Sequence, residues 1–333
     1  MTKLCWRVQD VSLVRRMYLK DHDSEMIFPQ PKIWQRVTPS PQEVHICGLQ
    51  QKELNIQWNH VTYVDTVCWF VEEIFELFRC APSLETFKIA RAKGLGGSIL
   101  FHETMTSSSS HIPFIHRHLR TLVYGGYDAI LFLSRVELPG LVDFSCNPKS
   151  LPNILPQEDQ MIFQHFFERC GSRLISLALE DMSFTFDALK SLLSSVPSLT
   201  KLRMGCSIPN LKDPVYRQTD EILLQFLEYL TETTLSHPSH EFLPHLSELD
   251  WRIVTSGLPW KRISNLFGMP EGLHNSHQRP FKVLRVYSRV LPEDIPYEII
   301  PDLFAPKGAP GMLIEYYHDR RCIVKKALGK HRR

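Results

Sequence analysis

Four histidines in the first half of the chain are the residues whose types and spacing come closest to a metal site. His102 opens the segment HETMT, and His111, His116 and His118 follow within HIPFIHRHLR. The helix of a zinc protease needs a second histidine in the order His-Glu-x-x-His, and HETMT lacks it. His116 and His118 alternate on an extended segment that could chelate a metal, but we expect a group of solvated loop histidines. The sequence therefore predicts no metal site.

A glycine-rich stretch, KGLGGS at 93–98, follows an expected strand, which is where a phosphate-binding loop would lie. It has neither the GK[ST] ending nor the GxGxxG spacing, and the segment ILFHETM after it does not begin an amphipathic helix. No GxSxG motif occurs, and no cysteine has the neighbours of an activated nucleophile. We therefore expect a protein that is not an enzyme and that has no cofactor.

The composition favours a folded protein. Of the 333 residues, 43% are hydrophobic and 11% are aromatic, enough for a sizeable core. The 38 Lys and Arg residues offset 36 Asp and Glu residues, a balance that argues against nucleic acid or an acidic membrane as partner. The best apolar run, VCWFV at 67–71, is too short to span a membrane. The eight cysteines stand far apart without a CxxC motif, and nothing supports the secreted context that a disulfide framework would need. We expect a soluble intracellular protein, cytoplasmic or nuclear.

A six-residue pattern with apolar residues at its first, fourth and sixth positions recurs along the chain. LETFKI from Leu84 and LTKLRM from Leu199 are two full copies. The other full copies begin at Leu119, Leu141, Leu174, Leu246 and Phe281, and partial copies are expected at 51–56 and 312–317. A proline stands two residues before four of the leading leucines, at Pro82, Pro139, Pro197 and Pro244. We interpret each copy as one short strand in a stack of similar units.

The longer gaps between the copies show helical periodicity. Thr62 and Asp65 have the spacing of a capping box and predict a helix within 62–80, and apolar stripes predict helices at 160–170, 187–196 and 220–230. Strands that alternate with helices predict an α/β fold. The architecture we expect is an irregular leucine-rich-repeat solenoid, with parallel strands on the concave side and helices on the convex side. A globular α/β domain whose buried strands happen to look alike is the alternative.

The sequence predicts three regions. Residues 1–40 are an N-terminal flank, residues 41–318 form the solenoid, and residues 319–333 are a basic C-terminal tail. The segment FPQPKIWQRVTPSPQ at 28–42 is typical of a loop with repeated prolines. The tail KKALGKHRR could be a nuclear import signal or a nucleic-acid contact, although a solubilising tail is the simpler interpretation.

Four segments resemble the leucine-rich-repeat portion of the large family of fungal F-box-like proteins. They are LFRCAPSLETFKI, LPGLVDFSC, LISLALEDMSFTFDALKSLLSSVPSLTKLRM and LPHLSELDW, and the resemblance covers roughly residues 45–318. In that family an F-box, a short helical bundle led by a Leu-Pro pair, precedes the repeats and docks the adaptor of a cullin ubiquitin ligase. Residues 1–40 show no such start, so a cullin adaptor is an expected partner only if an F-box exists upstream.

The remaining positions of each copy are expected to point outward and to form a surface for another protein. A small-molecule site would need an enclosed pocket instead. We therefore expect a non-enzymatic scaffold that recognises another protein on its strand face. The alternative is a substrate-recognition subunit of a cullin ubiquitin ligase whose F-box is lost or missing. The candidate binding residues are Glu85, Lys88, Arg120, Lys201, Arg203, Glu248, Asp250, Lys282 and Arg285.

Overall fold

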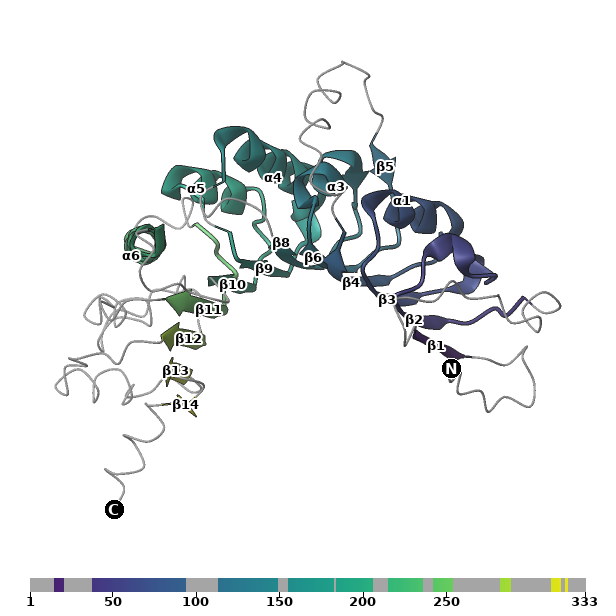
Figure 1. The fold of residues 1–333 in the computed structure, drawn as a ribbon. Helices are drawn as coiled ribbons and strands as arrows, with labels where there is room; N and C mark the ends of the chain where they lie inside the picture. Colours follow the sequence, from purple (N-terminus) through teal and green to yellow (C-terminus); the bar gives the residue numbers. More distant parts are fainter. Residues whose placement is uncertain are drawn as a thin grey trace. The chain divides into compact units, whose positions relative to one another are not determined.

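The structure is a computed structural model. It describes residues 15–20, 38–93, 113–148, 155–182, 184–205, 215–235, 242–253, 282–288, 313–318 and 321–322. The chain divides into two compact units, Met1–Leu151 and Pro152–Arg333. Each unit has an α/β fold in which parallel strands lie in sequence order and helices pack on one face of the sheet (Figure 1). The prediction of an α/β fold with parallel strands is therefore confirmed.

The first unit is built on a parallel sheet whose strands follow the order of the chain. They are β1 (Arg16–Lys20), β2 (Glu43–Cys47), β3 (Tyr63–Val67), β4 (Thr86–Ala92), β6 (Thr121–Gly126) and β8 (Asp143–Pro148). The helices α1 (Val71–Cys80) and α3 (Ala129–Arg135) lie on the same face of this sheet (Figure 1). A separate parallel pair joins β5 (Phe114–Ile115) and β7 (Val136–Glu137).

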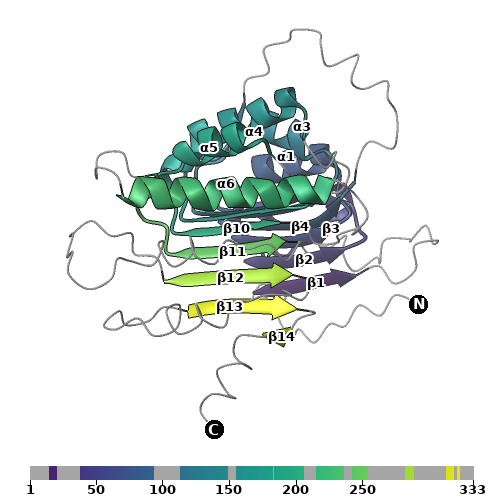
Figure 2. The same ribbon diagram turned by 90° about the vertical axis from the view of Figure 1, so that its left-hand side faces the viewer.

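The second unit repeats this arrangement. Its parallel strands are β9 (Ser176–Glu180), β10 (Lys201–Gly205), β11 (Glu248–Ile253), β12 (Val283–Ser288) and β13 (Leu313–His318), and β14 (Arg321–Cys322) pairs antiparallel with β13. Its helices are α4 (Gln157–Cys170), α5 (Phe186–Ser194) and α6 (Val215–Leu235), which bear out the helices expected at 160–170, 187–196 and 220–230. Figure 2 shows α6 on the same side of these strands as α4 and α5.

The six-residue pattern builds the core between the strands and the helices. Its fourth and sixth positions are buried, as at Phe87 and Ile89 in β4 and at Leu177 and Leu179 in β9. Equivalent positions lie opposite one another in neighbouring strands, so Leu202 pairs in register with both Leu177 and Leu249. Because successive side chains alternate across a strand, the third and fifth positions lie on the other side of the sheet, away from the helices.

The repeated prolines share one structural role. The leading leucines are Leu84, Leu141, Leu199 and Leu246, and the backbone N–H of each donates to the carbonyl three residues earlier at 3.0–3.1 Å. Proline at the second position of such a turn fixes a favourable φ angle. The turn places the leading leucine in the core and starts the strand.

A backbone ladder connects the second positions of neighbouring copies. The carbonyl of Thr200 accepts the N–H groups of Ser247 (2.8 Å) and Glu248 (2.9 Å). In the same way, the carbonyl of Thr62 accepts the N–H groups of Glu85 (2.9 Å) and Thr86 (3.0 Å). Each strand therefore begins in fixed register with its neighbour.

Three copies of the pattern are missing from the expected set. Their fourth and sixth positions are Met17 and Leu19 in β1, Val44 and Ile46 in β2, and Val64 and Thr66 in β3, all buried. The sequence pattern does not reveal these copies, because their first residue is valine or proline and not leucine. The parallel strands therefore begin inside the flank expected over residues 1–40, since β1 pairs with β2.

The helix expected from the Thr62–Asp65 spacing starts too early. The segment from Val61 to Val67 is rich in β-branched residues, which favour a strand, and its buried positions alternate. The helix begins at Val71 instead, where the backbone N–H of Phe70 donates to the carboxylate of Glu73 at 2.9 Å. The helix is therefore capped by Glu73 at Phe70, eight residues after the expected start at Thr62 (70 − 62 = 8).

The two partial copies have different outcomes. The expected strand at 51–56 is wrong, because Gln51–Glu53 form a turn of 3₁₀ helix. The expected strand at 312–317 exists as β13. Its register pairs Leu284 with Ile314 and Val286 with Tyr316, so the pattern begins one residue earlier than predicted. Of the basic tail, the structure describes Arg321 and Cys322 in β14, and the other tail residues lie outside the described part.

A left-handed residue lies two positions after the sixth position in five copies, at or near the end of the strand. These residues are Gly48, Cys68, Arg91, Gly126 and Asp181, with φ between 58° and 128°. At Gly126 a Cβ atom would lie 2.2 Å from the backbone nitrogen of Ala92, so only glycine fits there. A non-glycine residue in this conformation costs about 1–2 kcal/mol. The turn is therefore a common feature of the copies that no single residue type marks in the sequence.

Within the described ranges, no helix is both long enough and apolar enough to cross a membrane.

Candidate functional site

His116 has a structural role, contrary to the prediction of a solvated loop histidine. The residue is 4% exposed. Its Nδ1 accepts the N–H of Leu119 at 3.2 Å, and its Nε2 donates to the carbonyl of Ala81 at 3.1 Å. Burial lowers the pKa of His116, which favours the neutral ring that these two hydrogen bonds require. The imidazole thus replaces the turn carbonyl that receives the N–H of the leading leucine in the four proline-containing copies.

The other histidines offer no metal site in the part of the chain that can be described. His118 is exposed, whereas His102 and His111 lie outside the described residues. No group of three or more His, Cys, Asp or Glu side chains among the described residues could hold a metal ion. The glycine-rich stretch at 93–98 also lies outside them, apart from Lys93.

Two buried groups that titrate are held in unreactive states. The hydroxyl of Tyr124 donates to the carbonyl of Tyr127 at 2.5 Å, and burial raises the pKa of Tyr124 above its usual range. Burial also raises the pKa of the Cys146 thiol, so this cysteine stays protonated. Both side chains occupy the sixth position of a copy and face the core. They contribute to packing and have no access to a substrate.

We define the strand face of each unit as the surface formed by the third and fifth positions of its copies. Of the nine candidate binding residues, six occupy these positions: Lys88, Lys201, Arg203, Glu248, Asp250 and Arg285. The other three differ from the expectation. Glu85, Arg120 and Lys282 are second-position residues, exposed and placed immediately before β4, β6 and β12. They border the start of the strands, where their backbone groups belong to the ladder.

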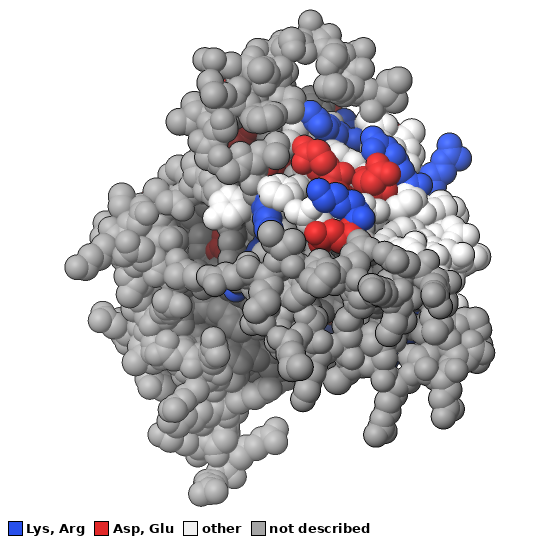
Figure 3. Space-filling view, turned by 45° about the vertical axis from the view of Figure 1, so that its right-hand side comes forward, with Lys and Arg blue, Asp and Glu red and all other residues white. Residues whose placement is uncertain are grey.

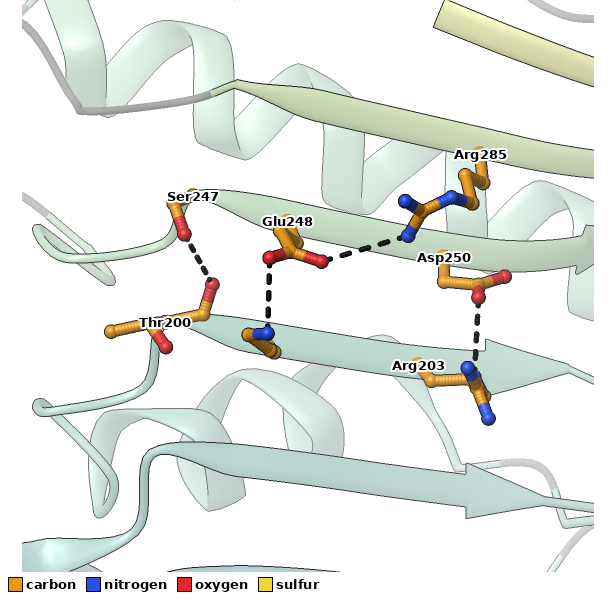
Figure 4. A network of polar contacts seen from close by, with 7 residues as sticks. Thr200, Arg203, Ser247, Glu248, Asp250 and Arg285 are labelled. Carbon is orange, nitrogen blue, oxygen red and sulfur yellow. Dashed lines mark hydrogen bonds and ion pairs between the residues drawn. The ribbon is translucent and has the colours of Figure 1, made fainter. Parts of the chain in front are cut away.

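Ion pairs connect the strand face of the second unit. The carboxylate of Glu248 on β11 lies 3.1 Å from the ammonium of Lys201 on β10 and 3.5 Å from the guanidinium of Arg285 on β12. The carboxylate of Asp250 accepts a hydrogen bond of 3.2 Å from Nε of Arg203. Figure 4 shows these contacts on three neighbouring strands, together with the bond from the Ser247 hydroxyl to the carbonyl of Thr200. The structure thus brings five of the candidate residues into two neighbouring groups of contacts, one around Glu248 and one between Arg203 and Asp250.

Aromatic rings occupy the strand face of the first unit, and the sequence analysis does not identify them. The ring of Tyr18 stacks on that of His45, with centroids 4.5 Å apart and an interplanar angle of 8°. The ring centroids of His45 and Tyr63 are 5.2 Å apart, and the ammonium of Lys88 lies 5.4 Å from the Tyr63 centroid. Tyr18 is 65% exposed, although it is a large aromatic residue. The three aromatic residues belong to the copies led by valine or proline, so recognising those copies would have revealed them.

Two further contacts complete this face. Nε of Arg16 lies 2.6 Å from the carboxylate of Glu43, and Nδ1 of His45 lies 3.6 Å from the carboxylate of Asp65. The strand face of the first unit therefore combines aromatic contacts with an ion pair and a contact between a histidine and a carboxylate.

Comparison with known proteins gives no match. No family model matches the chain, and no curated protein and no solved structure is significantly similar to it. The arguments about function below therefore rest on the geometry of the chain itself.

Proposed function

We propose that the chain is an irregular leucine-rich-repeat solenoid that acts as a non-enzymatic scaffold and binds another protein on its strand face. One observation carries the proposal. In each unit the helices pack on one side of the sheet, while the third and fifth positions present ordered polar and aromatic side chains on the other. Such a row on a rigid backbone suits a partner of protein size. A compartment that is cytoplasmic or nuclear belongs to the same proposal.

The charge distribution supports a protein partner over a phosphate-rich one. Nucleic acid requires a surface on which Lys and Arg outnumber acidic residues. In Figure 3, blue and red side chains lie side by side over the described part of the first unit. On the strand faces, each acid that we have described lies beside a cation or a histidine. A mixed surface of this kind gives specificity for a protein by complementary charges.

The second candidate is a substrate-recognition subunit of a cullin ubiquitin ligase. The resemblance to the repeats of fungal F-box-like proteins favours it, and its adaptor contact requires an F-box upstream of the repeats. In both cases the strand face is the surface that recognises the partner. The two candidates differ in the cullin adaptor, which a reconstituted binding assay with the purified adaptor detects.

Site-specific photo-crosslinking tests the proposed surface. A photoreactive amino acid is placed at Lys88 or Arg203 on the strand faces, and at Glu76 on α1 or Glu168 on α4 as exposed controls. We expect the two strand-face positions to crosslink to a protein and the two helical positions to give background only. Crosslinks from the helical positions alone would contradict the proposal.

A further inference from the structure

The charged side chains on the strand face of the second unit are layered by depth. The side chains of Lys201 and Arg203 are 55% and 50% exposed, whereas those of Glu248 and Asp250 are 30% and 10% exposed. The carboxylates therefore lie beneath, and the cations of β10 reach further into solvent. A partner that approaches this face meets positive groups first.

The guanidinium of Arg203 is held in a defined orientation. Its Nε donates to Asp250, which is a mostly buried side chain on the neighbouring strand. Among the described residues, Arg203 makes no other hydrogen bond. The fork of its two terminal nitrogens is therefore available, and such a fork matches the two oxygens of a carboxylate. Because Asp250 already restrains the side chain, binding sacrifices less conformational freedom than it would for an unrestrained arginine.

Lys201 is held in a similar way and repeats the arrangement at a fixed distance. Glu248 on β11 restrains its ammonium, which keeps further N–H donors for a second acceptor. Lys201 and Arg203 stand at alternate positions of one strand, so their Cα atoms are about 6.6 Å apart. Alternate residues of any extended segment have this same spacing. An extended partner with acidic residues two positions apart would therefore place one carboxylate at each cation.

The neighbouring charges limit where such a partner can lie. At the third and fifth positions of β9 to β12, the cations Lys201, Arg203 and Arg285 outnumber the acids Glu248 and Asp250. Glu180 lies opposite Gly205, beyond the end of the pair on β10. Lys282 stands exposed at the start of β12 and adds a further positive charge. Positive charge therefore exceeds negative charge over the first half of β10 to β12.

We propose that this part of the strand face binds an acidic protein segment in extended conformation, with carboxylates two residues apart on Lys201 and Arg203. The inference rests on the proposed function, because it names the class of partner for the same surface. Arg203 is the residue that sets the geometry, and Asp250 is a positioning residue that acts through it.

The test measures the fluorescence anisotropy of a labelled peptide with alternating acids, Thr-Glu-Thr-Glu-Thr, against the full chain at low salt. The control peptide carries Gln in place of Glu. We expect the acidic peptide to bind and the control peptide not to bind. Arg203→Gln should weaken binding by about tenfold or more, because a charge-assisted bidentate contact is lost. Arg203→Lys keeps the charge but loses the fork, so it should restore binding only in part. Arg169→Gln, on the exposed side of α4, should leave binding unchanged.

Three results would overturn the inference: no binding, equal binding of both peptides, or equal loss for Arg203→Gln and Arg169→Gln. The crosslinking experiment separates this failure from that of the proposed function. If the strand face crosslinks to a protein while the acidic peptide does not bind, only the acidic partner is wrong. If the crosslinks come from the helical side and the peptide does not bind, both proposals are wrong. Thermal melts of each variant confirm that the fold is retained.

Discussion

The strand faces of the two units share one backbone pattern and carry different chemistry. In the first unit, the rings of Tyr18 and His45 stack, and the ring of Tyr63 lies tilted against that of His45, so that aromatic contacts cross three strands. In the second unit, ion pairs of Lys201 and Arg203 with β11 cross the sheet instead. Among the residues whose burial the structure describes, the fourth and sixth positions bury apolar side chains in both units, with Thr66 as the exception. The comparison teaches that the core positions specify the scaffold, while the third and fifth positions are free to specify the partner.

The largest expected effect tests whether the cores of the two units are equivalent. Leu122→Ala in the first unit and Leu202→Ala in the second should each lower the free energy of unfolding by about 2–5 kcal/mol, because each removes a buried side chain. Thr121→Ala and Arg203→Ala, on the strand faces, should each change it by less than about 1 kcal/mol. Urea denaturation measures all four. Equal losses at core and face positions would show that the pattern does not define the core.

The next effect concerns a turn that is specific to the first unit. His116→Leu removes the acceptor of the Leu119 N–H and should destabilise this unit by about 1–3 kcal/mol. Because burial lowers the pKa of His116 in the folded state, the unfolded chain binds the proton more readily. The stability due to this histidine is present above the unfolded pKa of about 6.5 and declines as the pH falls below it. Denaturation at several pH values should show a decline in the wild type that His116→Leu reduces. An unchanged pH profile in the variant would contradict this role.

A smaller effect is expected at Thr66, whose core position is polar. The residue is fully buried, and its hydroxyl has no hydrogen-bond partner among the described residues. Thr66→Val replaces an unsatisfied hydroxyl by a methyl group of similar shape and should stabilise the first unit by about 1 kcal/mol. Thr66→Ser, which keeps the hydroxyl and loses the methyl group, should destabilise it. Thermal melts compare the two variants, and a lower melting temperature for Thr66→Val would mean that the hydroxyl has a partner.

The smallest effect compares the contacts of the two strand faces directly. A double-mutant cycle on Arg203 and Asp250 should give a coupling energy of up to about 1 kcal/mol that weakens in high salt, as expected for a partly exposed ion pair. A cycle on Tyr18 and His45 should give a coupling of about 0.5–1.5 kcal/mol with little dependence on salt. If both couplings respond equally to salt, the two faces do not differ in the way that their geometry indicates.

The sequence predicts the scaffold better than it predicts the site. Leucine-led copies with a preceding proline correspond to strands because the same turn and the same buried positions recur. The copies in β1 to β3 were missed because Val and Pro replace the leading leucine, and the early helix at Thr62 was a consequence of missing β3. Residues that share a face of neighbouring strands were predictable from the register of the pattern. The burial of each side chain was not predictable. Asp250 and Lys201 occupy equivalent outward positions in the pattern, yet the side chain of Asp250 is 10% exposed and that of Lys201 is 55% exposed.

The left-handed turns and the role of His116 could not be predicted from the sequence either. Glycine would have marked every turn, but Cys68, Arg91 and Asp181 adopt the same conformation because the surrounding copy imposes it. A histidine in a polar segment looks solvated unless the turn that it completes is known. Both features depend on contacts between copies that are distant in the sequence.

One measurement tests the central claim, which is that the strand face recognises the partner. Affinity capture is compared for the wild type, for Lys201→Gln with Arg203→Gln on the strand face, and for Arg169→Gln with Arg173→Gln outside it. Both double variants change the charge equally at exposed residues of the second unit. We expect the strand-face variant to lose the proteins captured by the wild type and the other variant to retain them, with similar melting temperatures for all three. Loss of those proteins by the Arg169 and Arg173 variant alone would contradict the account.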